Sequence, residues 1–212
     1  MRETGPGGAR MKAPLGLVLA GGEGRRLGGA DKALVPLAGR PLLAHVLARF
    51  EPQVEGCAVS ANGDPSRFAG WGLPVLADAA PGGQGPLAGV LAGLDWAAAE
   101  GAEMLVTVAV DTPFLPPDLV PRLILAAEDM AVPLAVAAAP LGGELRRHPA
   151  CALWPVALRE DLRAALRQGT RKLGGWAAEM GARQAFFASG EAAFFNVNRP
   201  EDLARAEAML SA

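Results

Sequence analysis

The apolar positions along the chain follow two different spacings. Short unbroken apolar runs bounded by glycine or polar residues are typical of buried strands, and apolar residues at i, i+3, i+4 and i+7 are typical of helices with one buried face. The unbroken runs predict strands over residues 15–20, 54–60, 73–76, 104–110, 134–139 and 151–154. The helical spacing predicts helices over residues 41–50, 87–94, 116–130, 156–167, 173–180 and 200–210.

The order of these elements predicts the fold class. Strands alternate with helices, which favours an α/β domain with a mostly parallel sheet, helices on both faces and right-handed crossovers. The run 104–110 is nearly continuous in apolar residues, as expected of a central strand covered on both faces. Ligands of such sheets bind beyond the carboxyl ends of the strands, so the residues after Ala20 and Val110 are the first candidates for a site.

Composition and charge narrow the class of protein further. The 212 residues, 51% of them hydrophobic, predict one domain over 15–212, and the Gly-, Arg- and Pro-rich residues 1–14 predict a flexible tail. Twenty Lys and Arg against 22 Asp and Glu argue against a basic surface for nucleic acid. No window of about 18 uninterrupted apolar residues is present, so we expect no membrane-spanning helix.

The two cysteines, Cys57 and Cys151, exclude some chemistry. Two isolated cysteines cannot form a tetrahedral zinc site by themselves, and they favour a reducing, cytoplasmic setting, with a single disulfide as the alternative. Neither cysteine adjoins an obvious base, and His45 lies inside an amphipathic helical pattern. The sequence therefore predicts no nucleophilic triad.

A glycine-rich, cationic loop follows the first predicted strand. Residues 21–29 contain five glycines, and Arg25, Arg26 and Lys32 add positive charge. Exposed amides in such a loop can hold phosphate oxygens, so the loop indicates a site for a nucleoside triphosphate. The alternative is a flexible surface loop with solvated cations.

Two standard phosphate-binding motifs do not match this loop. A P-loop needs Gly-Lys followed by Ser or Thr, whereas Lys32 follows Asp31 and precedes Ala33. A dinucleotide-binding fingerprint needs Gly or Ala at its last position, which Leu27 occupies here. If the loop binds a nucleotide, it therefore does so as neither of these two motifs.

The loop resembles the signature of the molybdenum cofactor guanylyltransferases. The matching residues are Leu19-Ala20-Gly21-Gly22, Arg26, Gly28-Gly29 and Asp31-Lys32, with Leu27 where the family usually has Met. Later segments match in the same order, and the resemblance extends from Leu15 to about Ala208. These segments are Asp78 with 85–89, then 111–119, 147–149 and 195–203. The resemblance implies a single Rossmann-like, three-layer α/β domain of the nucleotidyltransferase type.

The resemblance also implies a reaction. In this family GMP passes from GTP to the terminal phosphate of molybdopterin or molybdenum-molybdopterin, which releases pyrophosphate and forms molybdopterin guanine dinucleotide. The expected cofactor is Mg²⁺, and the expected partners are GTP and the molybdenum cofactor. Further expected partners are other cofactor-biosynthesis proteins and the acceptor molybdoenzymes or their chaperones.

Three alternatives to this reaction stay open. The first is a cytidylyltransferase on the same cofactor, although such relatives usually carry Ala-Ala-Gly where this chain has Ala20-Gly21-Gly22. The second is a nucleotidyltransferase that acts on a sugar phosphate. The third belongs to another class of protein, a non-catalytic adaptor that binds GTP, since a fold alone does not determine function.

The resemblance assigns the catalytic roles to three residues. Lys32 and Arg26 would contact the phosphates, where Lys32 would also neutralise charge on the leaving pyrophosphate. Asp111, at the end of the central strand, would bind Mg²⁺ and the nucleotide. The alternative for Asp111 is to accept backbone amides in the turn before Pro113.

Other residues are assigned to substrate binding. The nucleotide would also contact Leu19, Ala20, Gly21, Gly22, Ser60, Asn62 and Asp78. Ser60 stands where the family often has a base-contacting Asn, so Asn62 is a second candidate for that role. Candidate contacts for the pterin substrate are His148, Arg171, Lys172, Asn196 and Asn198. The alternatives are a structural His148, a solvated patch at 171–172, and packing roles for Phe194 and Phe195.

Overall fold

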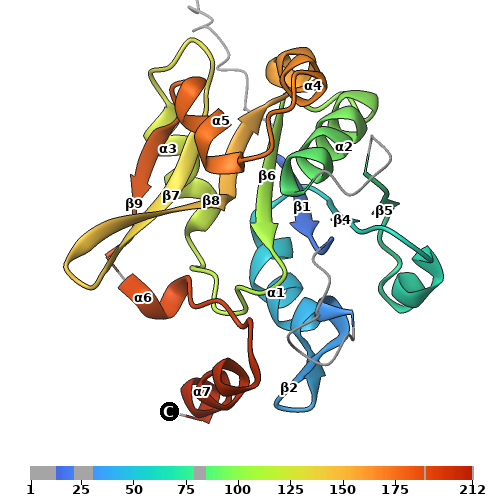
Figure 1. Ribbon diagram of the computed structural model, residues 1–212, viewed down its shortest axis with the longest axis vertical. Coiled ribbons are helices and arrows are strands. Elements are labelled where there is room, and N and C mark those ends of the chain that lie inside the picture. The colour runs from blue at the N-terminus through green and yellow to red at the C-terminus, as the bar shows by residue number, and fades with distance from the viewer. Residues whose placement is uncertain (1–12, 22–30, 79–84, 189, 212) are drawn as a thin grey trace, which may run out of the picture.

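The computed structural model describes residues 13–21, 31–78, 85–188 and 190–211. Its central element is a seven-stranded sheet with the strand order β5-β4-β1-β6-β8-β7-β9 (Figure 1). The strands of this sheet are β1 (Leu15–Leu19), β4 (Cys57–Ser60), β5 (Val75–Leu76), β6 (Met104–Ala109), β7 (Ala135–Leu141), β8 (Glu144–Pro155) and β9 (Arg183–Phe186). A separate hairpin consists of β2 (Pro36–Leu37) and β3 (Arg40–Pro41).

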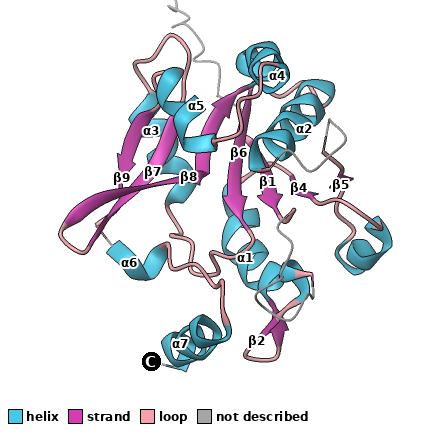
Figure 2. Ribbon diagram, viewed as in Figure 1, coloured by secondary structure: helices cyan, strands magenta, loops and turns pink. Residues whose placement is uncertain are grey.

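Helices cover both faces of the sheet, as the sequence predicts (Figure 2). One apolar cluster joins α1 and α3 to one face, and a second joins α2, α4 and α5 to the other face. The α-helices are α1 (Leu42–Phe50), α2 (Pro86–Ala99), α3 (Leu119–Ala127), α4 (Arg159–Arg167), α5 (Leu173–Glu179), α6 (Gly190–Ala193) and α7 (Pro200–Ser211). Short 3₁₀ helices are η2 (Lys32–Leu34), η3 (Glu51–Gln53), η4 (Pro65–Trp71) and η5 (Val156–Leu158).

The sheet is mostly parallel, which confirms the predicted fold class. β1 runs parallel to both of its neighbours, β4 and β6, and β9 runs parallel to β7. β8 is the exception, because it runs antiparallel to β6 on one side and to β7 on the other. The carboxyl ends of β1, β4 and β6 therefore meet at one edge of the sheet, toward β2 and α7 in Figure 1.

Several of the predicted strand and helix boundaries were wrong in exposed segments of the chain. The strand predicted over 151–154 is the buried end of the 12-residue β8, whose first half is polar and exposed in an antiparallel hairpin with β7. The helix predicted over 116–130 covers only Leu119–Ala127. The strand predicted over 54–60 begins at Cys57, and β9 was not predicted. Exposed segments lack the apolar spacing on which such predictions depend.

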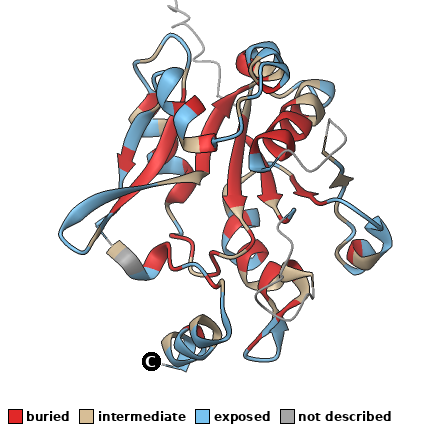
Figure 3. Cartoon of the chain, viewed as in Figure 1, coloured by how far each residue is buried: buried red, intermediate tan, exposed pale blue. Residues whose placement is uncertain are grey.

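The core lies between the sheet and its helices, and the central strands are buried almost throughout (Figure 3). The backbone of α2 approaches β1 and β6 closely at Gly93. A Cβ atom there would lie 2.5 Å from Cδ2 of Leu17 and 2.8 Å from Cδ2 of Leu105. Only a glycine therefore allows this helix to pack at its present depth.

A small third cluster holds the C-terminal helix against the β2–β3 hairpin. Phe195, Val197 and Ala206 pack with Val35, Leu37 and Leu42. The amide of Ala38 in the hairpin turn also donates to Oε1 of Glu207 in α7, at 3.3 Å. This cluster brings the segment before α7 back to the carboxyl edge of the sheet.

Cys57 and Cys151 are both free and buried, so the alternative of a disulfide is wrong. Burial raises the pKa of each thiol to about 12. Within the described part of the chain, no helix combines the length and the apolar character that crossing a bilayer requires. Residues 1–12 of the predicted tail lie outside the described residues.

Candidate functional site

The site is centred on Lys32, which is the first residue of η2. Its Nζ donates to Oδ2 of Asp111 and to Oδ1 of Asn198, both at 2.6 Å. Asp111 follows β6 at the carboxyl edge of the sheet, and Asn198 precedes α7. The side chains of Lys32 and Asp111 are only 12% and 18% exposed, so little solvent weakens their attraction. We call Lys32, Asp111 and Asn198 the lysine cluster.

Backbone and hydroxyl contacts fix the position of Asp111. The amide of Val197 donates to its carbonyl oxygen at 2.8 Å. The buried hydroxyl of Thr112 donates to Oδ1 of Asn196 at 3.0 Å and lies 3.4 Å from Oδ1 of Asp111. The turn amide of Thr112 donates instead to the backbone carbonyl of Ala109, so the carboxylate of Asp111 faces the lysine rather than the turn.

Asp202 fixes the position of Asn198. Its Oδ2 accepts the amides of Asn198 and Arg199, each at 2.9 Å, just before α7 begins. A carboxylate three residues into a helix that accepts the amide of the residue before the helix is part of a capping box. The cap therefore sets the direction from which Asn198 reaches Lys32.

The oxygen atoms of the lysine cluster are suitable ligands for a magnesium ion that is also bound by phosphates. Among the described residues, no group of three or more His, Cys, Asp and Glu residues could hold a metal alone. Mg²⁺ usually takes one or two carboxylates and completes its shell with water and substrate phosphates. The carboxylate of Asp111 and the amide oxygen of Asn198 match this pattern, and both oxygens already face one cation, the ammonium of Lys32.

Several of the predicted nucleotide-binding residues lie at the ends of β1 and β4. Leu19 ends β1, Ala20 is buried, and Gly21 is exposed beyond it. The amide of Ala20 donates to the carbonyl of Ser60 at 2.8 Å, so the two strand ends lie side by side. Gly22 and Arg26, which were also predicted to bind nucleotide, lie outside the described residues.

Ser60 and Asn62 have different surroundings. Ser60 is 2% exposed, and its hydroxyl lies against α2, where a Cβ atom on Gly89 would be 2.5 Å from Oγ. Asn62 is exposed, and its side chain exchanges two hydrogen bonds with Asp78, at 2.7 Å to the carboxylate and 2.9 Å from the amide. Of the two candidates for base contact, Asn62 is thus the accessible one.

The predicted pterin-binding residues do not form one group. Asn198 is part of the lysine cluster, and Asn196 lies beside the cluster, bound to Thr112. The guanidinium of Arg171 donates to the carbonyls of Leu166 and Thr170, so it caps the end of α4, and Lys172 is exposed beside it.

His148 is half-buried on β8 and stacks on Phe194, with 4.4 Å between ring centroids and 16° between planes. Burial, together with the positive charge of Arg146, lowers the pKa of His148 to about 4. The ring is therefore neutral at pH 7. It can stack or share a neutral hydrogen bond, but it cannot serve as a cation for a phosphate.

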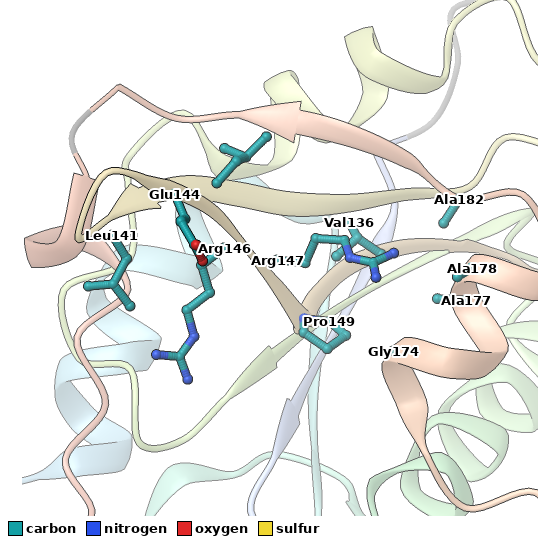
Figure 4. Close-up of a pocket in the computed structure, with 11 residues that line it drawn as sticks. Val136, Leu141, Glu144, Arg146, Arg147, Pro149, Gly174, Ala177, Ala178 and Ala182 are labelled. Carbon is teal, nitrogen blue, oxygen red and sulfur yellow. The ribbon is translucent and has the colours of Figure 1, made fainter.

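A cavity of about 540 Å³ lies between the β7–β8 hairpin and α5 (Figure 4). Its small-residue wall contains Gly174, Ala177 and Ala178 of α5, and its polar wall contains Arg146 and Arg147 of β8. Figure 4 shows the guanidinium of Arg147 extending toward α5. Glu144 also lines the cavity, and the size and the mixture of apolar and charged walls are typical of a small-molecule site.

Three residues of the site escaped the sequence analysis. Thr112 and Asp202 hold the lysine cluster in place, and Arg67 of η4 contacts Asp31 and Asn62. The capping pattern before α7 is a recognisable signal for Asp202. Arg67 has no such signal, because Asp31 lies 36 positions away and its two nearer partners are backbone carbonyls.

Comparison with known proteins gives concordant results. The sequence profile of the MobA-like NTP transferase domain matches residues 16–183. A molybdenum cofactor guanylyltransferase of Cereibacter sphaeroides is 61% identical over 195 residues, 92% of this chain and 96% of the relative. A protein of the same name from Mesorhizobium japonicum is 48% identical over 201 residues, 92% of this chain and 95% of the relative.

Solved structures share the fold. The molybdopterin-guanine dinucleotide biosynthesis protein A of Archaeoglobus fulgidus has a TM-score of 0.69 at 25% identity and covers 93% of this chain and 98% of its own. A 2-C-methyl-D-erythritol 4-phosphate cytidylyltransferase of Thermus thermophilus has a TM-score of 0.69 at 24% identity, over 95% of this chain and 100% of its own. The second likeness is one of fold alone.

Proposed function

The chain belongs to the MobA-like NTP transferase family and is a nucleotidyltransferase, and on that premise we propose that it transfers GMP from GTP to molybdopterin. An oxygen of the terminal phosphate of molybdopterin attacks the α-phosphorus of GTP. A new phosphorus–oxygen bond forms as the bond to the bridging oxygen breaks, and pyrophosphate leaves. The product is molybdopterin guanine dinucleotide.

The observation that carries this proposal is the meeting of Lys32 and Asp111 at the carboxyl edge of the sheet. This edge is where α/β sheets bind their ligands. A buried ammonium near the phosphates neutralises charge that develops on the leaving pyrophosphate, and its fixed position requires no rearrangement during the reaction. Asn198 holds the ammonium from a second direction.

Asp111 and Asn198 are the residues that would hold Mg²⁺ with the triphosphate. A magnesium ion at this position supplies charge neutralisation and orientation of the phosphate oxygens. Asp111 is fixed for this role by Val197 and Thr112 before any ligand arrives.

No protein nucleophile is needed, because the acceptor phosphate is itself competent. The thiols of Cys57 and Cys151 stay protonated at neutral pH, since burial raises each pKa to about 12. Catalysis then consists of alignment of two phosphates and neutralisation of their charge. We propose direct transfer without a covalent enzyme intermediate.

The nucleoside and the acceptor would occupy different parts of the site. The exposed Asn62–Asp78 pair offers donors and acceptors for the nucleoside. The cavity between the β7–β8 hairpin and α5 offers Arg146 and Arg147 to the anionic acceptor.

The test is a transfer assay with GTP labelled at the α-phosphate and purified molybdopterin as acceptor. We expect label in the dinucleotide product, stoichiometric pyrophosphate, and a requirement for Mg²⁺. Faster transfer from CTP would contradict the choice of nucleotide. Transfer only to a sugar phosphate would contradict the choice of acceptor, and GTP binding without pyrophosphate release would indicate an adaptor.

A further inference from the structure

Arg67 joins two parts of the site that are distant in sequence. Its Nε donates to the carboxylate of Asp31, and its Nη2 donates to the carbonyl of Asn62 at 2.5 Å. Its Nη1 donates to the carbonyl of Asp64, which precedes its own 3₁₀ helix η4. All three nitrogens of the guanidinium are thus engaged by the protein, and the side chain is 24% exposed.

The guanidinium is also held from one side. It lies over the ring of Phe68, with 4.7 Å between Cζ and the ring centroid. Phe68 is 1% exposed and belongs to the main apolar cluster, so the ring is a fixed platform. A planar cation stacked on an aromatic ring and bonded along its edges has little freedom to turn toward a substrate.

Through Asp31, Arg67 acts on Lys32. One carboxylate oxygen of Asp31 accepts from Arg67, and the other accepts the amide of Ala33 at 3.0 Å, which caps η2. Lys32 is the first residue of this short helix. The orientation of the Asp31 side chain therefore determines the position of the Lys32 backbone, from which the lysine side chain extends.

Through Asn62, Arg67 acts on the other end of the site. It holds the backbone carbonyl of Asn62, while the side chain of Asn62 accepts the amide of Asp78. The guanidinium of Arg67 therefore holds two features of the site. One is the Asn62–Asp78 pair, which would face the nucleoside, and the other is the Asp31 cap, which positions Lys32.

We propose that Arg67 is a positioning residue for nucleotidyl transfer. It places Lys32 through Asp31 and places the Asn62–Asp78 pair through the carbonyl of Asn62, without touching the substrate. The inference rests on the proposed function, because that function gives Lys32 and Asn62 their roles. The two ends of one nucleotide are then held at a fixed separation by a single side chain.

The first test compares Arg67→Lys with a matched control. Lysine keeps the positive charge but cannot bond to three partners in one plane. The control is Arg122→Lys, because Arg122 also pairs with an aspartate, Asp118, and also lies over a phenylalanine, Phe187, away from the lysine cluster. Transfer from GTP to molybdopterin is measured for both variants and for the wild type.

We expect Arg67→Lys to lower kcat by about 10-fold or more and to raise KM for GTP, as removal of pre-organisation does. Arg122→Lys should stay within about twofold of the wild type, as exposed pairs usually do. Equal kcat and KM in Arg67→Lys and in the wild type would overturn the inference. Equal losses in both arginine variants would overturn it as well, because they would indicate a general loss of stability.

A second measurement does not depend on turnover. Hydrogen exchange is followed at the amides of Ala33 and Asp78, which donate to Asp31 and Asn62, and at the amides of β6 as a reference for global unfolding. In Arg67→Lys we expect about 10-fold faster exchange at Ala33 and Asp78, with β6 unchanged. Unchanged exchange at these two amides would overturn the inference.

Asp31→Asn is the second variant if Arg67→Lys does not fold. Asparagine keeps an oxygen that can cap η2 but removes the charge that faces Arg67, so exchange at Ala33 should again increase. Wild-type protein that transfers no nucleotide would refute the proposed function, whereas the exchange at the two amides would still decide whether Arg67 sets their positions.

Discussion

Lys32 shows at the scale of one residue how the site concentrates charge. Its ammonium binds a carboxylate and an amide oxygen at 2.6 Å, and both it and Asp111 are largely withdrawn from solvent. Removal of one member of such a pair leaves the other without its partner, in an environment where charge is poorly screened.

We expect Lys32→Ala and Asp111→Asn each to slow transfer by about 100-fold or more, because each removes a charge fixed before the reaction. The measurement is kcat/KM for GTP in the transfer assay. Asp118→Asn is the control, since Asp118 forms a similar but exposed pair with Arg122. Wild-type turnover in a folded Lys32 or Asp111 variant would refute the role of that residue.

His148 gives a prediction about pH. Burial lowers its pKa to about 4, against an ordinary value of 6.5. The unfolded chain therefore binds more protons than the folded chain between these pH values, and stability falls as pH falls from 6.5 to 4. In His148→Gln the urea midpoint should depend less on pH over this window than in the wild type, and an identical dependence would contradict this account.

The meeting of Lys32 and Asp111 could be predicted from the sequence, because both follow strands whose carboxyl ends share one edge. The contact of Asn198 with Lys32 could not be predicted, since no periodicity links a residue after the last strand to the first loop. Arg67 was missed for a similar reason. One partner, Asp31, lies 36 positions away, and the other two, Asn62 and Asp64, belong to the turn after β4, so the contacts leave no repeating pattern in the sequence.

Glycines in α2 set the depth of packing at the scale of an element. Gly93→Ala would place a methyl group 2.5 Å from Leu17 and 2.8 Å from Leu105, so neighbouring side chains or the helix must move. We expect a loss of about 1–3 kcal/mol in the free energy of unfolding, measured by urea denaturation. This loss would outweigh the better helix propensity of alanine.

Gly175→Ala in α5 is the matched control. Its Cβ would meet only Cβ of Lys172, at 3.6 Å, which is an ordinary contact. Without a clash, helix propensity alone decides, and stability should rise by up to about 1 kcal/mol. Equal changes in the free energy of unfolding for Gly93→Ala and Gly175→Ala would mean that the close packing of α2 does not determine the loss of stability.

Elements with a buried face were predictable, and exposed ones were not. The apolar run of β6 and the helical stripe of α1 matched the structure to within a residue or two. β8 was recognised only where it enters the core, because its first four residues, 144–147, are exposed and mostly charged. A hairpin outside the core obeys turn geometry rather than hydrophobic spacing.

At the scale of the whole molecule, the C-terminal helix supports the site through Asp202. The cap that Asp202 provides to Asn198 and Arg199 fixes the approach of Asn198 to Lys32. We expect Asp202→Ala to destabilise the fold by about 1 kcal/mol, as loss of a cap does. The same change should lower kcat by about 10-fold, which corresponds to about 1.4 kcal/mol.

Glu201→Ala controls for charge near the start of α7, because Glu201 is its exposed sequence neighbour. Chemical denaturation and the transfer assay give the two quantities separately. A loss of stability without a loss of kcat would show that Asn198 keeps its position without the cap.

The lysine cluster joins residues that are 79 and 166 positions apart along the chain. Contacts of this range form late, because a long loop must close before they stabilise anything. During synthesis, the N-terminal part of the chain can form its first strands, but it does not yet contain a complete catalytic site. On the proposed function, a nascent chain gains activity toward GTP only when Asn198 has been synthesised and has folded back. Fragments left by interrupted translation should therefore be inert toward the nucleotide rather than partly active.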